Sequence, residues 1–376
     1  MQFRRERIDR NPPCGQLAFC LTEDLTGNGQ PDVVIGGLGR RYEITPLGKK
    51  LVLKQLPVVG DVLRRFEWNV FWYENPGWER HNIVQVPDLA VGASLADLTG
   101  DRRSDLVVGQ TLGSNLYWFE QPADPREPWP NRLITDEFTK YHDTAVGDID
   151  DDGEQELVVL SQRSETVFYY DIPEDPRQSP WPVENRHTIA DDLSVEGVAV
   201  SDIDGDGVTE LVAGQNVFSH DGTGWEREII APGWEWTRVG VADLDGDGQQ
   251  EIVLSEGDRP YHDDNPGRVG WYDPETDSLQ VLEDDLYCPH TLQVVDFTGD
   301  TLPDIYVAEM GLGNNEQPLH IVYVNNGDRT FEREVIARGV PTHEAKAVDL
   351  TGNGLIDIVG KSYTPSHHVD AWFQSA

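Results

Sequence analysis

The chain has 376 residues, with 68 Asp and Glu against 29 Lys and Arg, and a formal net charge of −39. This charge excludes nucleic acid as an expected partner, because phosphate binding depends on clustered cations. No apolar run approaches the ~18 residues of a membrane helix, and three cysteines cannot form a complete disulfide framework. We therefore expect a cytoplasmic protein without a membrane partner.

The first predicted element is a strand at residues 3–9 (FRRERID), and an acidic loop follows it. This nine-residue loop, D-(L/I/F)-(T/D)-(G/D)-(D/N)-x-x-x-(D/E), occurs seven times in the chain. The copies begin at Asp24, Asp97, Asp148, Asp202, Asp243, Asp296 and Asp349. Self-similarity at a spacing of this size indicates a solenoid or a propeller, and the strands around the loops decide between them.

Four strand-like stretches accompany each loop. A stretch rich in Val, Ala and Leu precedes the loop and an apolar run follows it. An aromatic stretch and a W-x-R-type stretch come next, as in LYWFEQP from Leu116 and WEREII from Trp225. Four short strands separated by Gly, Pro, Asn and Asp match one propeller blade. The sequence therefore predicts an all-β, seven-bladed β-propeller with four-stranded blades, in one domain over residues 1–376.

The first repeat carries an insertion at residues 38–69, which holds the basic island of the chain. Its cations are Arg40, Arg41, Lys49, Lys50, Lys54, Arg64 and Arg65. Long loops on a rigid scaffold are commonly functional. We expect either a loop that holds substrate charge or a small hairpin with a solvated charged face.

The two ends of the chain predict how the ring closes. The C-terminal VDAWFQSA has the pattern of a third strand, and no fourth strand follows it. The strand at residues 3–9 resembles the fourth-strand segment FEREVIA at residues 331–337. We expect the N-terminal strand to complete the last blade, which removes the exposed edges of an open ring. Because the chain begins directly in structure, we expect no signal peptide.

Each acidic loop places oxygen-bearing side chains at positions 1, 3, 5 and 9, which is typical of a tight Ca²⁺ loop. The candidate ligands are Asp24, Thr26, Asn28, Asp32, Asp97, Thr99, Asp101, Asp105, Asp148, Asp150, Asp152, Glu156, Asp202, Asp204, Asp206, Glu210, Asp243, Asp245, Asp247, Glu251, Asp296, Thr298, Asp300, Asp304, Asp349, Thr351, Asn353 and Asp357. The loops that begin at Asp148, Asp202 and Asp243 carry four carboxylates and should bind best. Arg102 and Thr301 stand where Gly is usual. The alternative is that Asp and Gly only form turns.

The acidity exceeds what metal binding requires. The loops offer 22 carboxylates at these positions, and seven divalent ions would still leave a charge of −25. Lysine is also scarce, with 6 Lys against 23 Arg. Acidic, lysine-poor surfaces stay soluble in concentrated salt. We interpret the chain as the product of an extreme halophile.

With seven loops in phase, the whole chain resembles the FG-GAP/VCBS repeat family, the calcium-loop propellers related to those of integrin α chains. The family serves both adhesion and catalysis, so the resemblance implies a fold and not an activity. The chain is also similar to propeller-fold polysaccharide lyases that act on uronate-containing chains and to the propeller of aldos-2-ulose dehydratase. These likenesses imply chemistry near the ring axis.

One aligned position gives the sharpest functional signal in the chain. Six residues before the first Asp of each loop, the repeats hold Ala18, Val91, His142, Glu196, Thr237, His290 and His343. First strands line the axis of a propeller, so these side chains should converge there. Three imidazoles and a carboxylate suit Zn²⁺ or another divalent transition metal. The alternative is that they cap strand ends and meet only water.

Further polar and aromatic groups are expected on the same face. Tyr141 and Tyr287 precede first strands, Arg238 follows the aligned position, and His262 lies in a loop of the fifth repeat. We expect Tyr141, Tyr287 or His262 to remove a proton and Arg238 to hold substrate charge. No nucleophile elbow, P-loop or dinucleotide fingerprint is present.

Together these features favour an intracellular, carbohydrate-active lyase or dehydratase that performs β-elimination on an anionic or keto sugar. A metal held by His142, His290, His343 and Glu196 would polarise the group beside the acidic carbon. A single histidine acting as a base without metal is a close variant. The alternative is a non-catalytic, calcium-stabilised binding or assembly propeller.

Overall fold

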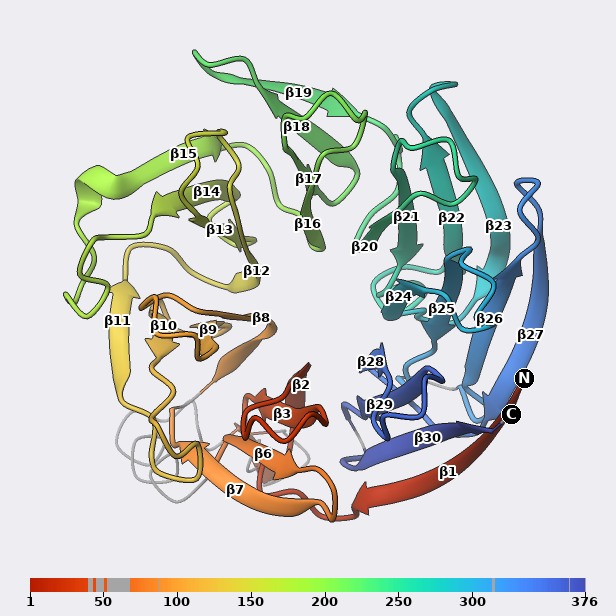
Figure 1. Cartoon of the computed structure of the whole chain (residues 1–376), viewed down its shortest axis with the longest axis horizontal. Helices are drawn as coiled ribbons and strands as arrows, with labels where there is room; N and C mark the ends of the chain where they lie inside the picture. The colour runs from red at the N-terminus through yellow and green to blue at the C-terminus, as the bar shows by residue number, and fades with distance from the viewer. Residues whose placement is uncertain are drawn as a thin grey trace.

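The computed structural model describes residues 1–39, 43–44, 51–52, 68–86, 88–312, 315–364 and 366–375. They form seven four-stranded antiparallel sheets arranged as blades around a central axis (Figure 1). This confirms the predicted seven-bladed β-propeller. The seven cations of the basic island, Arg40 to Arg65, lie outside the described residues. No helix in the described ranges is long and apolar enough to cross a membrane.

The blades follow one another along the chain, and each runs outward from the axis. Blade 1 contains β2 (Leu17–Glu23), β3 (Asp32–Gly37), β6 (Val70–Glu74) and β7 (Glu79–Val84), with the small pair β4 (Glu43–Ile44) and β5 (Leu51–Val52) between β3 and β6. Blade 2 contains β8 (Leu89–Ala96), β9 (Asp105–Gln110), β10 (Leu116–Phe119) and β11 (Asn131–Thr135). Blade 3 contains β12 (Tyr141–Gly147), β13 (Glu156–Ser161), β14 (Thr166–Asp171) and β15 (Arg186–Ala190), with a short 3₁₀ helix (Val183–Asn185) before β15.

The remaining blades repeat the pattern. Blade 4 contains β16 (Val198–Ser201), β17 (Glu210–Ala213), β18 (Asn216–His220) and β19 (Trp225–Ile229). Blade 5 contains β20 (Thr237–Ala242), β21 (Glu251–Glu256), β22 (Gly267–Asp273) and β23 (Ser278–Leu286). Blade 6 contains β24 (Thr291–Val295), β25 (Asp304–Ala308), β26 (Leu319–Asn325) and β27 (Phe331–Arg338). Blade 7 contains β28 (Glu344–Val348), β29 (Asp357–Lys361), β30 (Val369–Ser375) and β1 (Gln2–Asp9).

The N-terminal strand completes the last blade, as the sequence predicts. β1 pairs antiparallel with β30, from Gln2 opposite Ser375 to Arg7 opposite Asp370. Figure 1 shows β1 on the outer edge of blade 7, with the two termini side by side. Arg5 and Arg7 both donate to the buried Asp370 carboxylate at 2.9 Å. This pairing covers the outer edge of β30.

The apolar core lies between neighbouring blades. Second strands such as β3, β9 and β13 are buried along their whole length, because a blade packs against each of their faces. Fourth strands such as β19 form the outer surface and are largely exposed. Each large apolar cluster joins two adjacent blades. The ring is therefore held by inter-blade packing, which fixes the strand ends that meet at the axis.

Candidate functional site: an axial histidine and carboxylate cavity

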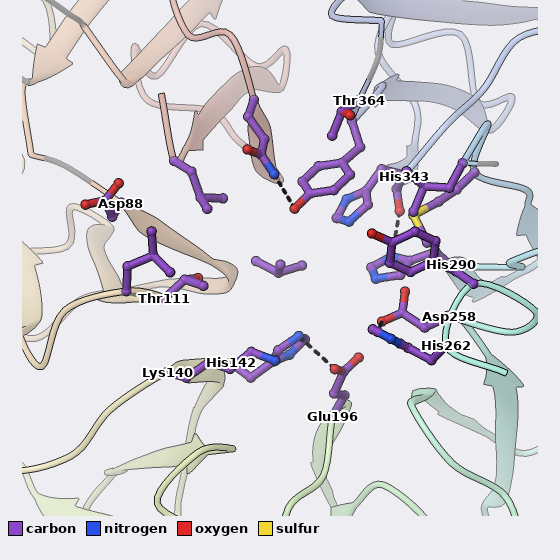
Figure 2. Close-up of a pocket in the computed structure, with 18 of the residues that line it drawn as sticks. Asp88, Thr111, Lys140, His142, Glu196, Asp258, His262, His290, His343 and Thr364 are labelled. Carbon is purple, nitrogen blue, oxygen red and sulfur yellow. Dashed lines mark hydrogen bonds and ion pairs between the residues drawn. The ribbon is translucent and has the colours of Figure 1, made fainter. Parts of the chain in front are cut away.

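A cavity of about 440 Å³ opens at the axis of the ring. Its lining comes from two kinds of segment, as the alignment of the repeats predicts. One is the residues just before or within the first strands, and the other is the loops between the second and third strands. The lining residues include Gln16, Asp88, Val91, Thr111, Leu112, Lys140, His142, Glu196, Asp258, Tyr261, His262, His290, Met310, His343 and Tyr363. Figure 2 shows the labelled histidines and carboxylates around this space.

Five of the seven aligned positions reach the cavity. Val91, His142, Glu196, His290 and His343 line it, whereas Ala18 and Thr237 are buried outside the cavity lining. In β12 the register with β13 shifts between Tyr141 and Asp143, so His142 is the extra residue of a bulge. Bulges redirect side chains next to functional sites, and this one lies where His142 meets the cavity.

His142 is held between two carboxylates. Its Nδ1 lies 2.7 Å from Asp143 Oδ2 and its Nε2 lies 3.2 Å from Glu196 Oε1. Burial lowers the pKa of His142, but the charges of Glu196 and Asp143 outweigh it and hold the pKa above the usual value. The Arg238 guanidinium and His142 overcome the effect of burial on Asp143 and hold its pKa well below the usual range. Asp143 therefore orients His142 as a permanent anion.

Glu196 is a buried carboxylate whose two oxygens have different surroundings. It is 2% exposed, and Gln162 Nε2 donates to its Oε1 at 2.7 Å. Its other oxygen, Oε2, has no hydrogen-bond partner in the described part of the chain. Burial raises the pKa of Glu196 above the usual value, although His142 opposes this shift. A carboxyl group whose pKa is raised by burial in this way is a candidate for a general base.

His290 and His343 stack on the opposite side of the cavity, with ring centroids 4.0 Å apart. His290 Nδ1 lies 2.8 Å from the carbonyl oxygen of His343. His343 Nδ1 contacts Lys361 Nζ, which also contacts the carbonyl oxygens of Leu17 and Ala18. Burial lowers the pKa of His290 to about 3 and that of Lys361 to about 7. Burial also lowers the pKa of His343 well below its usual value, so both stacked imidazoles are neutral at neutral pH.

A second histidine and carboxylate pair lies nearer the mouth of the cavity. His262 Nε2 lies 3.2 Å from Asp258 Oδ2, one turn earlier in the loop between β21 and β22. The hydrogen bond that His262 donates to Asp258 is the main cause that raises the pKa of His262. His262 is thus held protonated at a higher pH than an isolated histidine, which suits a proton donor.

Arg238 lies at a different level from the one expected. It lines a second, narrower compartment of about 150 Å³, together with Asp143, Glu344 and Lys346. Its guanidinium is ion-paired with Asp143 at 3.2 Å and is largely buried. Because side chains alternate along a strand, the residue after an aligned position faces away from the cavity. Arg238 therefore anchors Asp143 and does not contact the cavity.

Tyr141 and Tyr287 are also outside the cavity lining. Tyr141 is 1% exposed and packs between blades 2 and 3, where its hydroxyl donates to Ser114 O at 2.8 Å. A Cβ at Gly109 would lie 2.3 Å from Tyr141 Cβ, so the glycine makes room for the ring. Tyr287 packs beside the buried cluster of Cys288, Met310 and Leu312. Both tyrosines act in packing, which corrects their expected role as bases.

The arrangement at the axis does not fit the expected transition-metal site. Both ring nitrogens of His142 already contact carboxylates, and the Nδ1 atoms of His290 and His343 are also engaged. Among the residues that the structure describes, no group of three axial ligand atoms lies within 4.8 Å of one another. Three side chains must converge to hold such an ion, so no step of the chemistry is assigned to an axial metal.

Three acidic loops do bring ligands together. The groups are Asp148, Asp150 and Glu156 in blade 3, Asp202, Asp204 and Asp206 in blade 4, and Asp243, Asp245 and Asp247 in blade 5, each with ligand atoms within 4.8 Å of one another. Asp148 Oδ1, Asp150 Oδ1 and Glu251 Oε1 are buried without a partner in the described residues. Hard, converging oxygens of this kind fit Ca²⁺. These are the three loops with four carboxylates.

The other four loops differ at position 9, where Asp replaces Glu. In blade 1, Asp32 Oδ2 accepts from Leu25 N at 3.0 Å and Oδ1 accepts from Asn75 N at 2.8 Å. The same double acceptance occurs at Asp105, Asp304 and Asp357. Both carboxylate oxygens already serve backbone N–H groups. Position 9 therefore has a structural role in these loops, and its expected role as a calcium ligand stays a prediction.

The same four blades carry an amide that links them to the preceding blade. Asn75 Nδ2 donates to Leu350 O at 2.7 Å, from blade 1 to blade 7. Gln121, Asn325 and Gln374 make the equivalent bond from blades 2, 6 and 7. The ring thus contains two kinds of loop, one suited to an ion and one closed by hydrogen bonds.

No protein-family model and no curated protein sequence matches this chain at a significant level. Among solved structures, it is similar to an "AfRom2 CNH domain", with a TM-score of 0.50 and 9% sequence identity over 99% of this chain and 100% of that chain. A lower similarity, with a TM-score of 0.38 and 12% identity, covers 91% of this chain and 18% of a chain of the Photorhabdus luminescens Tc holotoxin pore. At such identities the likeness shows the propeller fold alone.

Proposed function

We propose that the axial cavity is the active site of a carbohydrate-active lyase or dehydratase, which performs β-elimination on an anionic or keto sugar. The observation that carries this proposal is Glu196, a buried carboxyl group with one unpartnered oxygen in a cavity that also holds the His262–Asp258 pair. A base of raised pKa and a separate protonated acid are the two groups that β-elimination requires.

In the proposed reaction, Glu196 Oε2 takes the proton from the carbon beside the carbonyl or carboxylate of the sugar. The electron pair of that C–H bond forms the new double bond, and the bond from the β-carbon to its oxygen breaks. His262 gives its proton to the departing oxygen. Protonated His142 beside Glu196 stabilises the carboxylate before the reaction, and Lys140 at the cavity wall supplies positive charge for an anionic sugar.

We further propose that the loops of blades 3, 4 and 5 hold Ca²⁺, in keeping with the resemblance to FG-GAP/VCBS repeats. The converging ligand atoms and the unpartnered oxygens of these loops support this. Such ions would stabilise the ring on the face away from the cavity, because the acidic loops and the cavity lie at opposite ends of the first strands. They take no part in the elimination.

A screen of uronate-containing polysaccharides and keto sugars tests the function. Each compound is incubated with the protein, and the ultraviolet absorbance of a conjugated double bond is followed. Appearance of an unsaturated product supports the lyase or dehydratase. Binding of saccharides without any unsaturated product would contradict it and favour a non-catalytic, calcium-stabilised binding propeller.

A further inference from the structure

In the part of the chain that the structure describes, every blade contributes to the wall of the axial cavity. Each blade supplies at least one lining residue, namely Gln16, Val91, His142, Glu196, Asp258, His290 and His343 for blades 1 to 7 in order. The interfaces between blades are filled with buried apolar side chains. The described wall thus forms a pit around the axis, which favours a saccharide chain that enters along the axis over one that lies across it.

Paired charges line a narrower compartment below the cavity. Beneath the layer of histidines, the compartment of about 150 Å³ contains the Arg238–Asp143 ion pair at 3.2 Å and the Lys346–Glu344 ion pair at 3.4 Å. Separating buried or partly buried ion pairs is costly, because each charge would lose its partner. This space suits a few water molecules and not the passage of a polymer.

The floor also presents a hydrogen-bond donor beside an acceptor. A lysine ammonium has three donors and no acceptor, and Lys361 Nζ meets three acceptors, namely Leu17 O, Ala18 O and His343 Nδ1. When Lys361 is in its ammonium form, His343 Nδ1 accepts and His343 carries its proton on Nε2. His290 Nδ1 donates to His343 O, so its Nε2 keeps a lone pair. Two neighbouring hydroxyl groups of a sugar, one accepting and one donating, match this stacked pair.

An exposed aromatic ring lies at the mouth of the cavity. Tyr261 is 54% exposed, although large apolar side chains are usually covered. Its ring packs edge-on against His262 at 5.0 Å, and His262 in turn packs against Trp236 at 5.0 Å. Tyrosine offers a rigid apolar face at a low cost in conformational entropy. Such a face can cover one side of a pyranose ring.

We propose that the axial cavity binds saccharide chains by one end, with the terminal ring against His290 and His343 and the next ring against Tyr261. This inference rests on the proposed function for the class of ligand and makes the enzyme exo-acting. The wall that surrounds the axis and the paired charges below it favour the end-on geometry. The rim tyrosine makes a disaccharide the smallest fully bound ligand.

Calorimetric titration of the full chain tests the end-on geometry. The Glu196→Gln variant is used to prevent turnover, and the probes are galacturonic acid, its dimer and trimer, and polygalacturonate chains of two defined lengths. End-on binding predicts a fixed number of protein molecules per chain, whatever its length. A number that grows with chain length, or no binding of any of these probes, would overturn the proposal.

Two variants at Tyr261 test the second subsite. Tyr261→Ala should weaken dimer binding three- to tenfold and leave monomer binding unchanged, whereas Tyr261→Phe should keep the affinity for both. Equal losses for monomer and dimer would contradict a role in holding the second ring. Binding is measured without turnover, so end-on binding by a protein that converts no sugar would refute the proposed function and leave this inference standing.

Discussion

Removal of divalent ions should lower the stability of the ring through the loops of blades 3, 4 and 5. In each of these loops three ligand atoms lie within 4.8 Å of one another. Two like charges at this distance repel by about 3 kcal/mol at an effective dielectric of 20. A bound Ca²⁺ reverses the sign of this interaction. We therefore expect calcium to bind the folded state and not the unfolded state.

The size of the effect follows from mass action. At a hundredfold excess of Ca²⁺ over the dissociation constant, each site adds about 2.7 kcal/mol of stability, or about 8 kcal/mol for three sites. An unfolding entropy of roughly 2 cal/mol/K per residue gives about 0.8 kcal/mol/K for the 376-residue chain. Full chelation should then lower the melting temperature by about 10 °C.

Scanning calorimetry at constant salt, with and without a chelator, measures this shift. Asp204→Ala should remove about a third of the calcium response, because Asp204 belongs to one of the three converging groups. Asn28→Ala is the matched control in blade 1. It loses a 2.7 Å bond to Asn75 O and should lower the melting temperature, but its calcium response should stay intact. An unchanged melting temperature after exhaustive chelation would refute the calcium sites.

Three further predictions follow from the fold and the cavity. Deletion of residues 1–9 removes β1 and exposes β30, so we expect aggregation or loss of cooperative unfolding, and a soluble truncation of native stability would contradict the closure. Elemental analysis should find no stoichiometric transition metal in the wild type or in His290→Ala, and a metal lost only in the variant would restore the metal site. Turnover should rise with pH through the raised pKa of Glu196, which must be deprotonated, and fall through the raised pKa of His262, which must be protonated. A profile that lacks the basic limb would remove His262 as the acid.

The sequence predicts the ring well, because the acidic loop recurs once per blade and fixes the register of all seven. The same register found His142, Glu196, His290 and His343, since the residues aligned to the loop occupy one level of the axis. It failed for Arg238, one residue further on. Side-chain alternation turns that residue toward the lower compartment.

The partners of these residues could not be found in the same way. Asp258 belongs to a loop between a second and a third strand, and Lys361 lies at the end of a second strand. The insertions that follow second strands differ from blade to blade, so the repeats cannot be aligned there. The sequence places Tyr141 at the cavity, but the residue precedes a bulge. The bulge directs His142 to the cavity and leaves the tyrosine in the core. The spacing of charges alone does not reveal which of them are already paired.

The most direct test of the proposed function is the elimination rate of Glu196→Gln on a substrate that the wild type converts. Glutamine keeps the size of the side chain but cannot accept the carbon-bound proton. The rate should fall by about 10³-fold, as expected for loss of a general base. The exposed Glu184→Gln variant serves as the matched control and should keep the wild-type rate. A Glu196→Gln protein with normal fold and undiminished turnover would contradict the assignment of Glu196 as the base.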